Sequence, residues 1–435
     1  MASCFSCLPS CASSAWRSAL HPGSVEREAA GPSPSTFARR ASWPQAVAAP
    51  PIKTLVVLSH EASDIHDELS TDVGTDTDLE DELKAESDTD SISCTMFAGS
   101  VHDDVKRILQ MEEVRPWQSH AMQRIRTLQE ARRSFGNVML MRNVEDGGAF
   151  PRECWAVKKI PRDWMTESSE EFDRKHPHET EKVWIDVGIL RYLGEQNFSY
   201  SCKLLGVFED ERNMYVASTF ASGGDLCSWC VRQYLHCRFG EEREALIRPI
   251  VKQMLDAVRH LHDLGIAHRD LSLENVVLCS DADSEVMNLK LIDFAMSTFD
   301  DPCSCTQICG KKAFRAPEIY SGKTYNAFLT DAFALGVMIF ILAMDDHPWT
   351  STVKGDCKFF EYCRYKGLRK LLQVRPFSGW KSRRSPMIDV LSEPLLQLVE
   401  GLTEFQPRDR CTLGEECWSN SSRQRAVVWD KQWLQ

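Results

Sequence analysis

The chain has 435 residues, a net charge of −12 and 43% hydrophobic residues, enough to bury a sizeable core. The acidic excess lies between Glu61 and Asp90, and no basic stripe of the kind typical of nucleic-acid-binding proteins is present elsewhere. The 17 cysteines follow no regular framework, which indicates a reducing compartment, and no stretch reaches the roughly 20 apolar residues of a membrane helix.

Residues 1–105 are rich in Ser, Pro, Ala and acidic side chains and lack apolar periodicity, so we predict a disordered N-terminal region. Three cysteines near the start, Cys4, Cys7 and Cys11, are candidates for S-palmitoylation, which would bring the chain to a membrane surface. Incidental thiols explain this cluster equally well. The first residues lack a charged segment followed by an apolar one, so we expect a cytoplasmic protein without a visible leader for export.

The composition becomes globular from about Val114. Residues 115–222 alternate apolar residues with turns and predict a small β-rich lobe, whereas residues 223–420 contain helical patterns such as IRPIVKQMLDAVRHLHDLG. We expect residues 421–435 to be a C-terminal tail. The expected fold is therefore α+β and bilobal, with the β-rich lobe first, and we expect a monomer.

A series of motifs runs through this globular part. WAVKK places Lys158 late in a predicted strand, and VASTFASGGDL ends another strand before a Gly-rich turn. HRDLSLENVVL, LIDFAMS, APE, DAFALG and QPRDR follow in that order. Each motif is weak alone, but together they cover residues 120–420 and resemble the protein kinase family. The resemblance implies the bilobal protein kinase fold, ATP and Mg²⁺ as cofactors, and Ser or Thr residues of proteins as substrates.

The resemblance also implies a role for each matching position. Lys158 would orient the phosphates of ATP, Asp270 would align the substrate hydroxyl, and magnesium would bind Asn275 and Asp293. The residues expected around ATP are Gly136, Val138, Ala156, Lys158, Asp186, Ser218 (as a small gatekeeper), Thr219, Phe220, Ala221, Asp225 and Val277. The residues expected to support the site structurally are His268, Arg269, Glu318, Asp331 and Arg410.

The glycine-rich loop departs from the usual kinase pattern. In ARRSFGNV only Gly136 survives, and Ala131 and Arg133 stand where two further glycines are usual. Glycine lets the backbone approach phosphates closely, so this loss weakens or reshapes the cover over ATP. The DFG motif has also become DFA, which keeps the metal-binding Asp293 and predicts a stiffer hinge.

The acid that pairs with Lys158 is irregular as well. WIDVGILRYL has the spacing of the helix that carries this acid, which makes Asp186 the candidate, one methylene shorter than the usual Glu. Glu181 and Glu179 remain alternatives, and Asp186 could instead belong to the polar face of its helix.

These departures resemble a particular group of kinases. KKIPRDW after the lysine strand, the absent lysine of the catalytic loop, DFA, the reduced glycine loop and GKKAFRAPE are similar to the FIKK family, divergent kinases of apicomplexan parasites. The tetrad that names the family falls at Ala156–Lys159, where this chain reads AVKK. Members of that family phosphorylate Ser, Thr and occasionally Tyr of proteins.

The catalytic loop carries Ser272 where most serine/threonine kinases carry a lysine. Aligned backwards from APE, GKKAFRAPE places Lys311 where those kinases have a Thr beside the catalytic Asp. We therefore interpret the pair as an exchange, in which Lys311 supplies the cation near the γ-phosphate and Ser272 the hydroxyl. The alternative is that Lys311 is one of two exposed basic residues that select acidic substrates.

Two other functions fit parts of the pattern. A pseudokinase would keep the fold and bind nucleotide or partners without efficient turnover, and the reduced glycine loop and absent lysine favour it. A small-molecule kinase of the aminoglycoside type shares H-x-D-x-x-x-x-N but would lack APE and QPRDR. The retained Lys158, Asp270, Asn275 and Asp293 favour an active protein kinase.

Overall fold

The computed structural model describes residues 100–131, 136–144, 154–234, 238–280, 287–377, 385–418 and 424–435, which all belong to one compact unit within residues 56–435. The predicted disorder before residue 100, the cysteines Cys4, Cys7 and Cys11, and Arg133 of the reduced glycine loop lie outside these residues.

The N-terminal lobe is built on a six-stranded sheet in the order β1-β5-β6-β4-β3-β2, antiparallel except for the β1–β5 pair. The two-residue period of β4 places Trp155 and Val157 in an apolar cluster, so that Ala156 and Lys158 face the opposite side. Its elements are α3 (Ser100–Met111), β1 (Val114–Pro116), β2 (Met122–Ala131), β3 (Gly136–Asn143), β4 (Cys154–Pro161), α4 (Ser169–Lys175), α5 (Val183–Glu195), β5 (Leu204–Glu209) and β6 (Asn213–Thr219).

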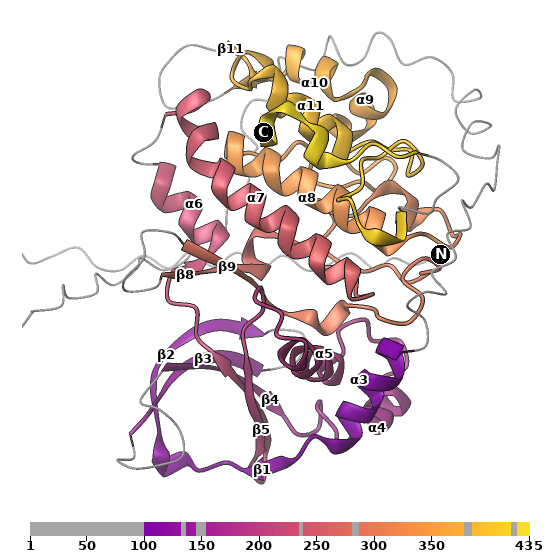
Figure 1. Ribbon diagram of the computed structural model, residues 1–435. Helices are drawn as coiled ribbons and strands as arrows, with labels where there is room; N and C mark the ends of the chain where they lie inside the picture. Colours follow the sequence, from indigo (N-terminus) through magenta and orange to yellow (C-terminus); the bar gives the residue numbers. More distant parts are fainter. Residues whose placement is uncertain are drawn as a thin grey trace, which may run out of the picture. The chain divides into compact units, whose positions relative to one another are not determined.

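The C-terminal lobe is mostly helical, as Figure 1 shows. Its elements are β7 (Gly224–Asp225), α6 (Leu226–Tyr234), α7 (Glu241–Asp263), β8 (Val276–Ser280), β9 (Met287–Leu291), α8 (Ala327–Met344), α9 (Lys358–Lys366), α10 (Leu368–Val374), β10 (Pro376–Phe377), β11 (Ser385–Pro386) and α11 (Glu393–Leu402). The predicted α+β division, with the β-rich lobe first, is confirmed.

Helix α8 forms the centre of the helical lobe. Among the described helices it is the one long and apolar enough to cross a membrane, but all 18 of its residues are buried inside the lobe. Its composition is therefore that of a core helix. Gly336 lets α11 approach closely, because a Cβ at this position would lie 2.7 Å from Thr403 Cγ2 and 2.8 Å from Leu402 Cβ.

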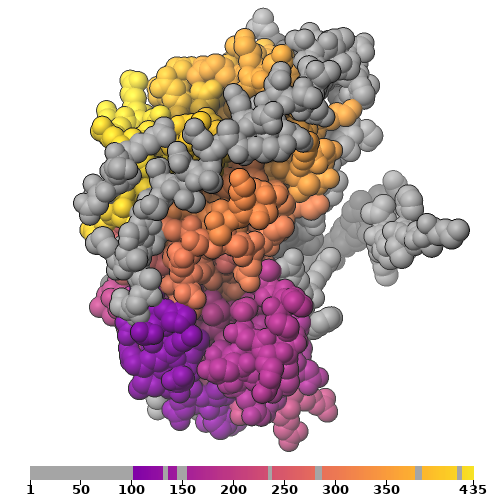
Figure 2. Space-filling view, turned by 90° about the vertical axis from the view of Figure 1, so that its right-hand side faces the viewer, coloured from indigo at the N-terminus to yellow at the C-terminus, as the bar shows by residue number. Residues whose placement is uncertain are grey.

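The start of the folded chain differs from the prediction. The sequence predicts disorder for residues 100–105, but they form the first half of α3, where Val101 and Val105 are buried. α3 packs against α5, and β1 then joins the edge of the sheet beside β5. Figure 2 shows the indigo surface of this N-terminal extension (residues 100–117) directly beside the magenta surface of later residues of the same lobe.

Candidate active site

Lys158 lies on β4 and faces three carboxylates. Its Nζ is 3.4 Å from Asp293 Oδ1, 3.9 Å from Asp186 Oδ2 and 4.0 Å from Glu181 Oε1. Burial by itself lowers the pKa of Lys158, but these negative charges outweigh it and hold the pKa well above its ordinary value. Two of the three candidate acids thus reach the lysine together, whereas Glu179 accepts hydrogen bonds from the backbone N–H groups of residues 180 and 181.

Asp186 also connects α5 to the segment that follows Asp293. Its Oδ1 accepts a hydrogen bond of 2.9 Å from the N–H of Phe294, and the pKa of Asp186 is raised by burial. A second link joins Lys182 N to Ala295 O at 2.8 Å. The shorter side chain of Asp186 therefore bridges the lysine and the DFA segment.

Asp293 has a left-handed backbone, with φ 65°, and the charge of Lys158 lowers its pKa. The next residue, Phe294, is fully buried and its ring lies 5.1 Å from that of His268. Ala295 has no positive φ and sits in the 3-10 helix Phe294–Met296, so its side chain is compatible with this backbone. Alanine in place of the usual glycine therefore leaves Asp293 in position.

Asp270 and Asn275 face each other across the loop HRDLSLEN. Asn275 Nδ2 donates to the backbone O of Asp270 at 2.7 Å and to its Oδ2 at 3.0 Å, which leaves the amide oxygen of Asn275 unused by this pair. Asp270 Oδ1 is buried and accepts no hydrogen bond within the described part of the chain. Burial raises the pKa of Asp270, while the charges of Lys311 and His268 oppose the rise.

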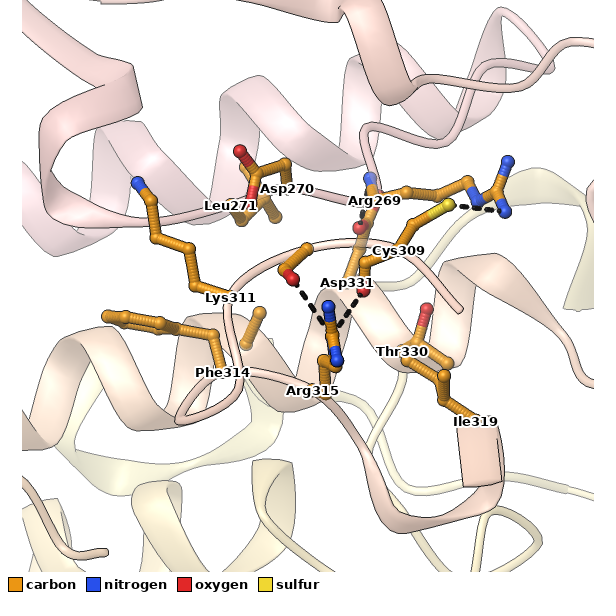
Figure 3. A pocket seen from close by; sticks show the side chains of 12 residues that line it. Arg269, Asp270, Leu271, Cys309, Lys311, Phe314, Arg315, Ile319, Thr330 and Asp331 are labelled. Carbon is orange, nitrogen blue, oxygen red and sulfur yellow. Dashed lines mark hydrogen bonds between the residues drawn. The ribbon is translucent and has the colours of Figure 1, made fainter. Parts of the chain in front are cut away.

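Lys311 reaches the space beside Asp270. Its Nζ donates to Ser272 Oγ at 2.5 Å and lies 3.1 Å from Glu274 Oε2. Figure 3 shows the Lys311 side chain rising beside Asp270. The segment that carries Lys311 comes close to the catalytic loop at Gly310, which has φ 84°. A Cβ at this position would lie 2.7 Å from Arg269 O. The exchange hypothesis requires the side chains of Lys311 and Ser272 to lie close together, and in the structure they are in contact.

Asp331 holds the start of the same loop. Its two carboxylate oxygens accept the backbone N–H groups of His268 at 2.7 Å and Arg269 at 2.8 Å. Arg269 has φ 66°, a conformation that costs free energy for a non-glycine residue unless neighbouring groups hold it. Its guanidinium donates to Cys309 Sγ at 2.9 Å and to the Tyr325 hydroxyl at 3.3 Å, and Figure 3 shows the first of these bonds.

Further expected residues lie where the motifs place them. Arg410 is fully buried and pairs with Glu318 through two hydrogen bonds of 2.6 and 3.0 Å. Asp225 pairs with Val277 across β7 and β8, but both of its carboxylate oxygens accept hydrogen bonds from Ser228. The expected ribose ligand therefore also caps α6.

The three β-strands around Lys158 bring together other residues that are expected around ATP. Val138 on β3 pairs with Lys158, and Ala156 on β4 pairs with Ser218 on β6. The N–H of Thr219 donates to Lys203 O at 3.0 Å, and Phe220 and Ala221 follow directly after the strand. The expected gatekeeper and hinge positions thus lie at the end of β6.

A model of the protein kinase domain family matches residues 132–420 of this sequence. The chain belongs to the protein kinase family. The match covers most of both lobes, and all the residues from Lys158 to Arg410 described above lie within it. As a protein kinase domain, the structure has the framework of an enzyme that transfers phosphate from a nucleotide.

Gly136 of the kinase domain is explained by its position in the sheet. Strand β3 starts at this residue, and a Cβ there would lie 2.1 Å from Lys159 O of the neighbouring strand. The close approach of β3 to β4 thus requires a glycine at this position. Ala131, which stands at one of the usual glycine positions, ends β2 and pairs with Gly136.

A buried histidine that belongs to none of the sequence motifs contacts Asp331. His262 of α7 lies 3.1 Å from Asp331 Oδ2 and 2.8 Å from Glu415 Oε1, and all three side chains are almost fully buried. Burial acts to lower the pKa of His262, but the hydrogen bonds and charges of Asp331 and Glu415 raise it to about 9. The protonated ring therefore balances two buried carboxylates.

We expect the stability of the kinase domain to fall above neutral pH because of His262. Its folded-state pKa of about 9 exceeds the unfolded value of about 6.5, so its contribution is complete below pH 6.5 and is lost as pH rises through 9. Between pH 7 and 8 the loss amounts to about 1 kcal/mol. Urea unfolding at both pH values measures it, with His262→Gln as the control that lacks this slope. Equal slopes in the two proteins would contradict the assignment.

Proposed function

We propose that this chain is an ATP- and Mg²⁺-dependent protein kinase that phosphorylates Ser and Thr residues of protein substrates. The observation that carries the proposal is Asp270 Oδ1, a buried carboxylate oxygen that no described residue uses. A buried acceptor without a partner is costly unless a ligand satisfies it. A substrate hydroxyl that donates to this oxygen would do so, and burial raises the pKa of Asp270 toward the range of a general base.

The donor set fits magnesium and a nucleotide phosphate. The carboxylate of Asp293 and the amide oxygen of Asn275 are hard oxygen ligands, and the Asn275 amide is oriented by the two bonds that its Nδ2 donates to Asp270. Bound magnesium would neutralise charge on the phosphates during transfer. Lys158, fully charged among its carboxylates, would orient the α and β phosphates.

Lys311 supplies the cation that the catalytic loop lacks. Its amine bonds inward to Ser272 Oγ, at the position where the usual lysine would start, and its charge acts on Asp270. Both lysine side chains are exposed, 43% for Lys311 and 64% for Lys312, but their partners differ, because the Lys312 amine lies 3.4 Å from Asp356 Oδ2. This difference between neighbouring lysines favours the exchange over a pair of exposed basic residues that selects acidic substrates.

The same exchange supports a finer assignment to the FIKK group. The contact between Lys311 and Ser272 joins the two sequence features, GKKAFRAPE and HRDLSLEN, that separate the chain from ordinary serine/threonine kinases. The backbone of Ala295 in DFA is compatible with a side chain. Asp186, which replaces the usual Glu, still lies 3.9 Å from the Lys158 amine. The chain is therefore proposed to be a divergent kinase with a compensated site.

Phosphate transfer from ATP to a Ser/Thr/Tyr peptide library, with and without Mg²⁺, tests this function on the full chain. We expect incorporation on Ser and Thr that disappears when the metal is chelated. Nucleotide binding without transfer would identify a pseudokinase, and transfer to small aminoglycosides alone would identify the small-molecule kinase; either result overturns the proposal.

A further inference from the structure

The N-terminal extension packs on the helix that carries Asp186. Val105 of α3 is fully buried, and Gly188 of α5 faces it, because a Cβ at Gly188 would lie 3.0 Å from Val105 Cγ1 and 3.0 Å from Leu109. Contacts this short are tighter than ordinary packing allows, so the two helices approach as closely as a glycine permits. The position of α5 is thereby fixed from its outer side.

A partly buried ion pair fixes the end of the extension. Arg191 of α5 donates to Glu112 through Nε at 2.9 Å and through Nη2 at 2.7 Å, and the Glu112 side chain is only 5% exposed. Two parallel bonds between a guanidinium and a carboxylate restrict both side chains. Two residues later Val114 pairs with Val207, which joins the extension to the sheet.

The other end of α3 touches the segment that follows Asp293. The His102 ring lies 5.8 Å from the ring of Phe299, and its Nδ1 is 3.8 Å from Asp300 Oδ1. The middle and the end of the extension thus contact α5, and its start contacts the segment that follows Asp293. α5 in turn presents Asp186 to Lys158 and to the N–H of Phe294.

We propose that α3 is a built-in positioning element of the kinase site: Val105, Leu109 and Glu112 hold α5 so that Asp186 reaches Lys158 and Phe294. The inference rests on the proposed function and extends it to residues outside the matched kinase domain, which begins at residue 132. Asp186 is one methylene shorter than a Glu, so a small outward shift of α5 breaks its contact with Lys158. The extension compensates for that short reach.

The test compares two glycines of the same helix. Gly188→Leu places a side chain against α3, whereas Gly194→Leu, the matched control, meets no atom within 4 Å. For Gly188→Leu we expect kcat/KM to fall about tenfold, mainly through a higher KM for ATP, and the Phe294 amide to exchange hydrogen at least tenfold faster. Activity and exchange equal to those of Gly194→Leu would overturn the proposal.

A charge exchange gives a second, independent test. Glu112→Arg and Arg191→Glu are each expected to lower kcat/KM and to speed exchange of the Phe294 amide, and the double variant is expected to restore most of both. No restoration in a folded double variant overturns the proposal. Because amide exchange is measured without turnover, an inactive wild-type chain would overturn the proposed function while exchange still decides the role of α3.

Discussion

Asp270→Asn is expected to lower kcat about a thousandfold, roughly 4 kcal/mol, while ATP binding changes little. In the native site Asn275 Nδ2 donates to Asp270 Oδ2. An amide at position 270 would keep that bond through its oxygen and would turn its NH₂ group toward the position of Oδ1. A donor would then face the substrate hydroxyl where the reaction needs an acceptor.

The measurement is phosphate transfer by the full chain, with ATP affinity measured in parallel. Asp163→Asn, an exposed carboxylate just after β4, is the matched control and is expected to behave as wild type. If Asp270→Asn keeps more than about a tenth of wild-type kcat, Asp270 is not the general base. Loss of ATP affinity together with kcat would instead indicate a folding defect.

The motif order predicted the central contacts of the site because each motif fixes a position in one shared backbone framework. The two bonds between Arg410 and Glu318 and the contact between Lys311 and Ser272 join segments 92 and 39 residues apart. From the sequence, the acid that pairs with Lys158 could be any of Asp186, Glu181 and Glu179. Packing of the folded chain decides that Asp186 and Glu181 reach the amine.

The extension was only partly readable from the sequence. Val101, Val105 and Ile108 recur at helical spacing and are buried. They directly follow a long acidic and Ser-rich segment, so the composition does not show where the folded part begins. Short amphipathic helices gain most of their stability from the surface they pack on, here α5. The sequence therefore predicts a start of the globular part near Val114, whereas the folded chain already includes α3 from Ser100.

The buried network around His262 had no sequence signal. His262 and Glu415 are 153 residues apart, and neither belongs to a recognised motif. Their pairing depends on how α7, α8 and the residues after α11 pack, which local periodicity does not encode. A histidine among apolar residues of a helix is equally compatible with a neutral core position, so only the two carboxylates identify it as charged.

Lys311→Ala is expected to lower kcat/KM by about two to three orders of magnitude, because a positioned donor and charge beside the reacting phosphate is lost. Lys312→Ala is the matched control, since this exposed neighbour bonds only outward to Asp356 among the described contacts, and it is expected to keep wild-type turnover. If both variants keep their turnover but lose a preference for acidic peptides, the lysines select substrates and the exchange hypothesis is wrong.

The pH profile gives a signed test of the same residue. Asp270 must be ionised to accept a proton, and the charge of Lys311 counteracts the rise that burial causes in its pKa. Without Lys311 the pKa of Asp270 rises further, so the acid limb of kcat/KM is expected to move to higher pH in Lys311→Ala. An unmoved limb would mean that the amine does not act on Asp270.

The double variant Ser272→Lys with Lys311→Thr restores the arrangement of an ordinary serine/threonine kinase. Glu274 lies 3.1 Å from the present amine and can receive the relocated one, so the cation stays within the same small space. We expect kcat/KM to return to within about tenfold of wild type, against the larger loss in Lys311→Thr alone. Recovery in the double variant alone shows that position 272 and position 311 share one catalytic cation, which either backbone segment can supply.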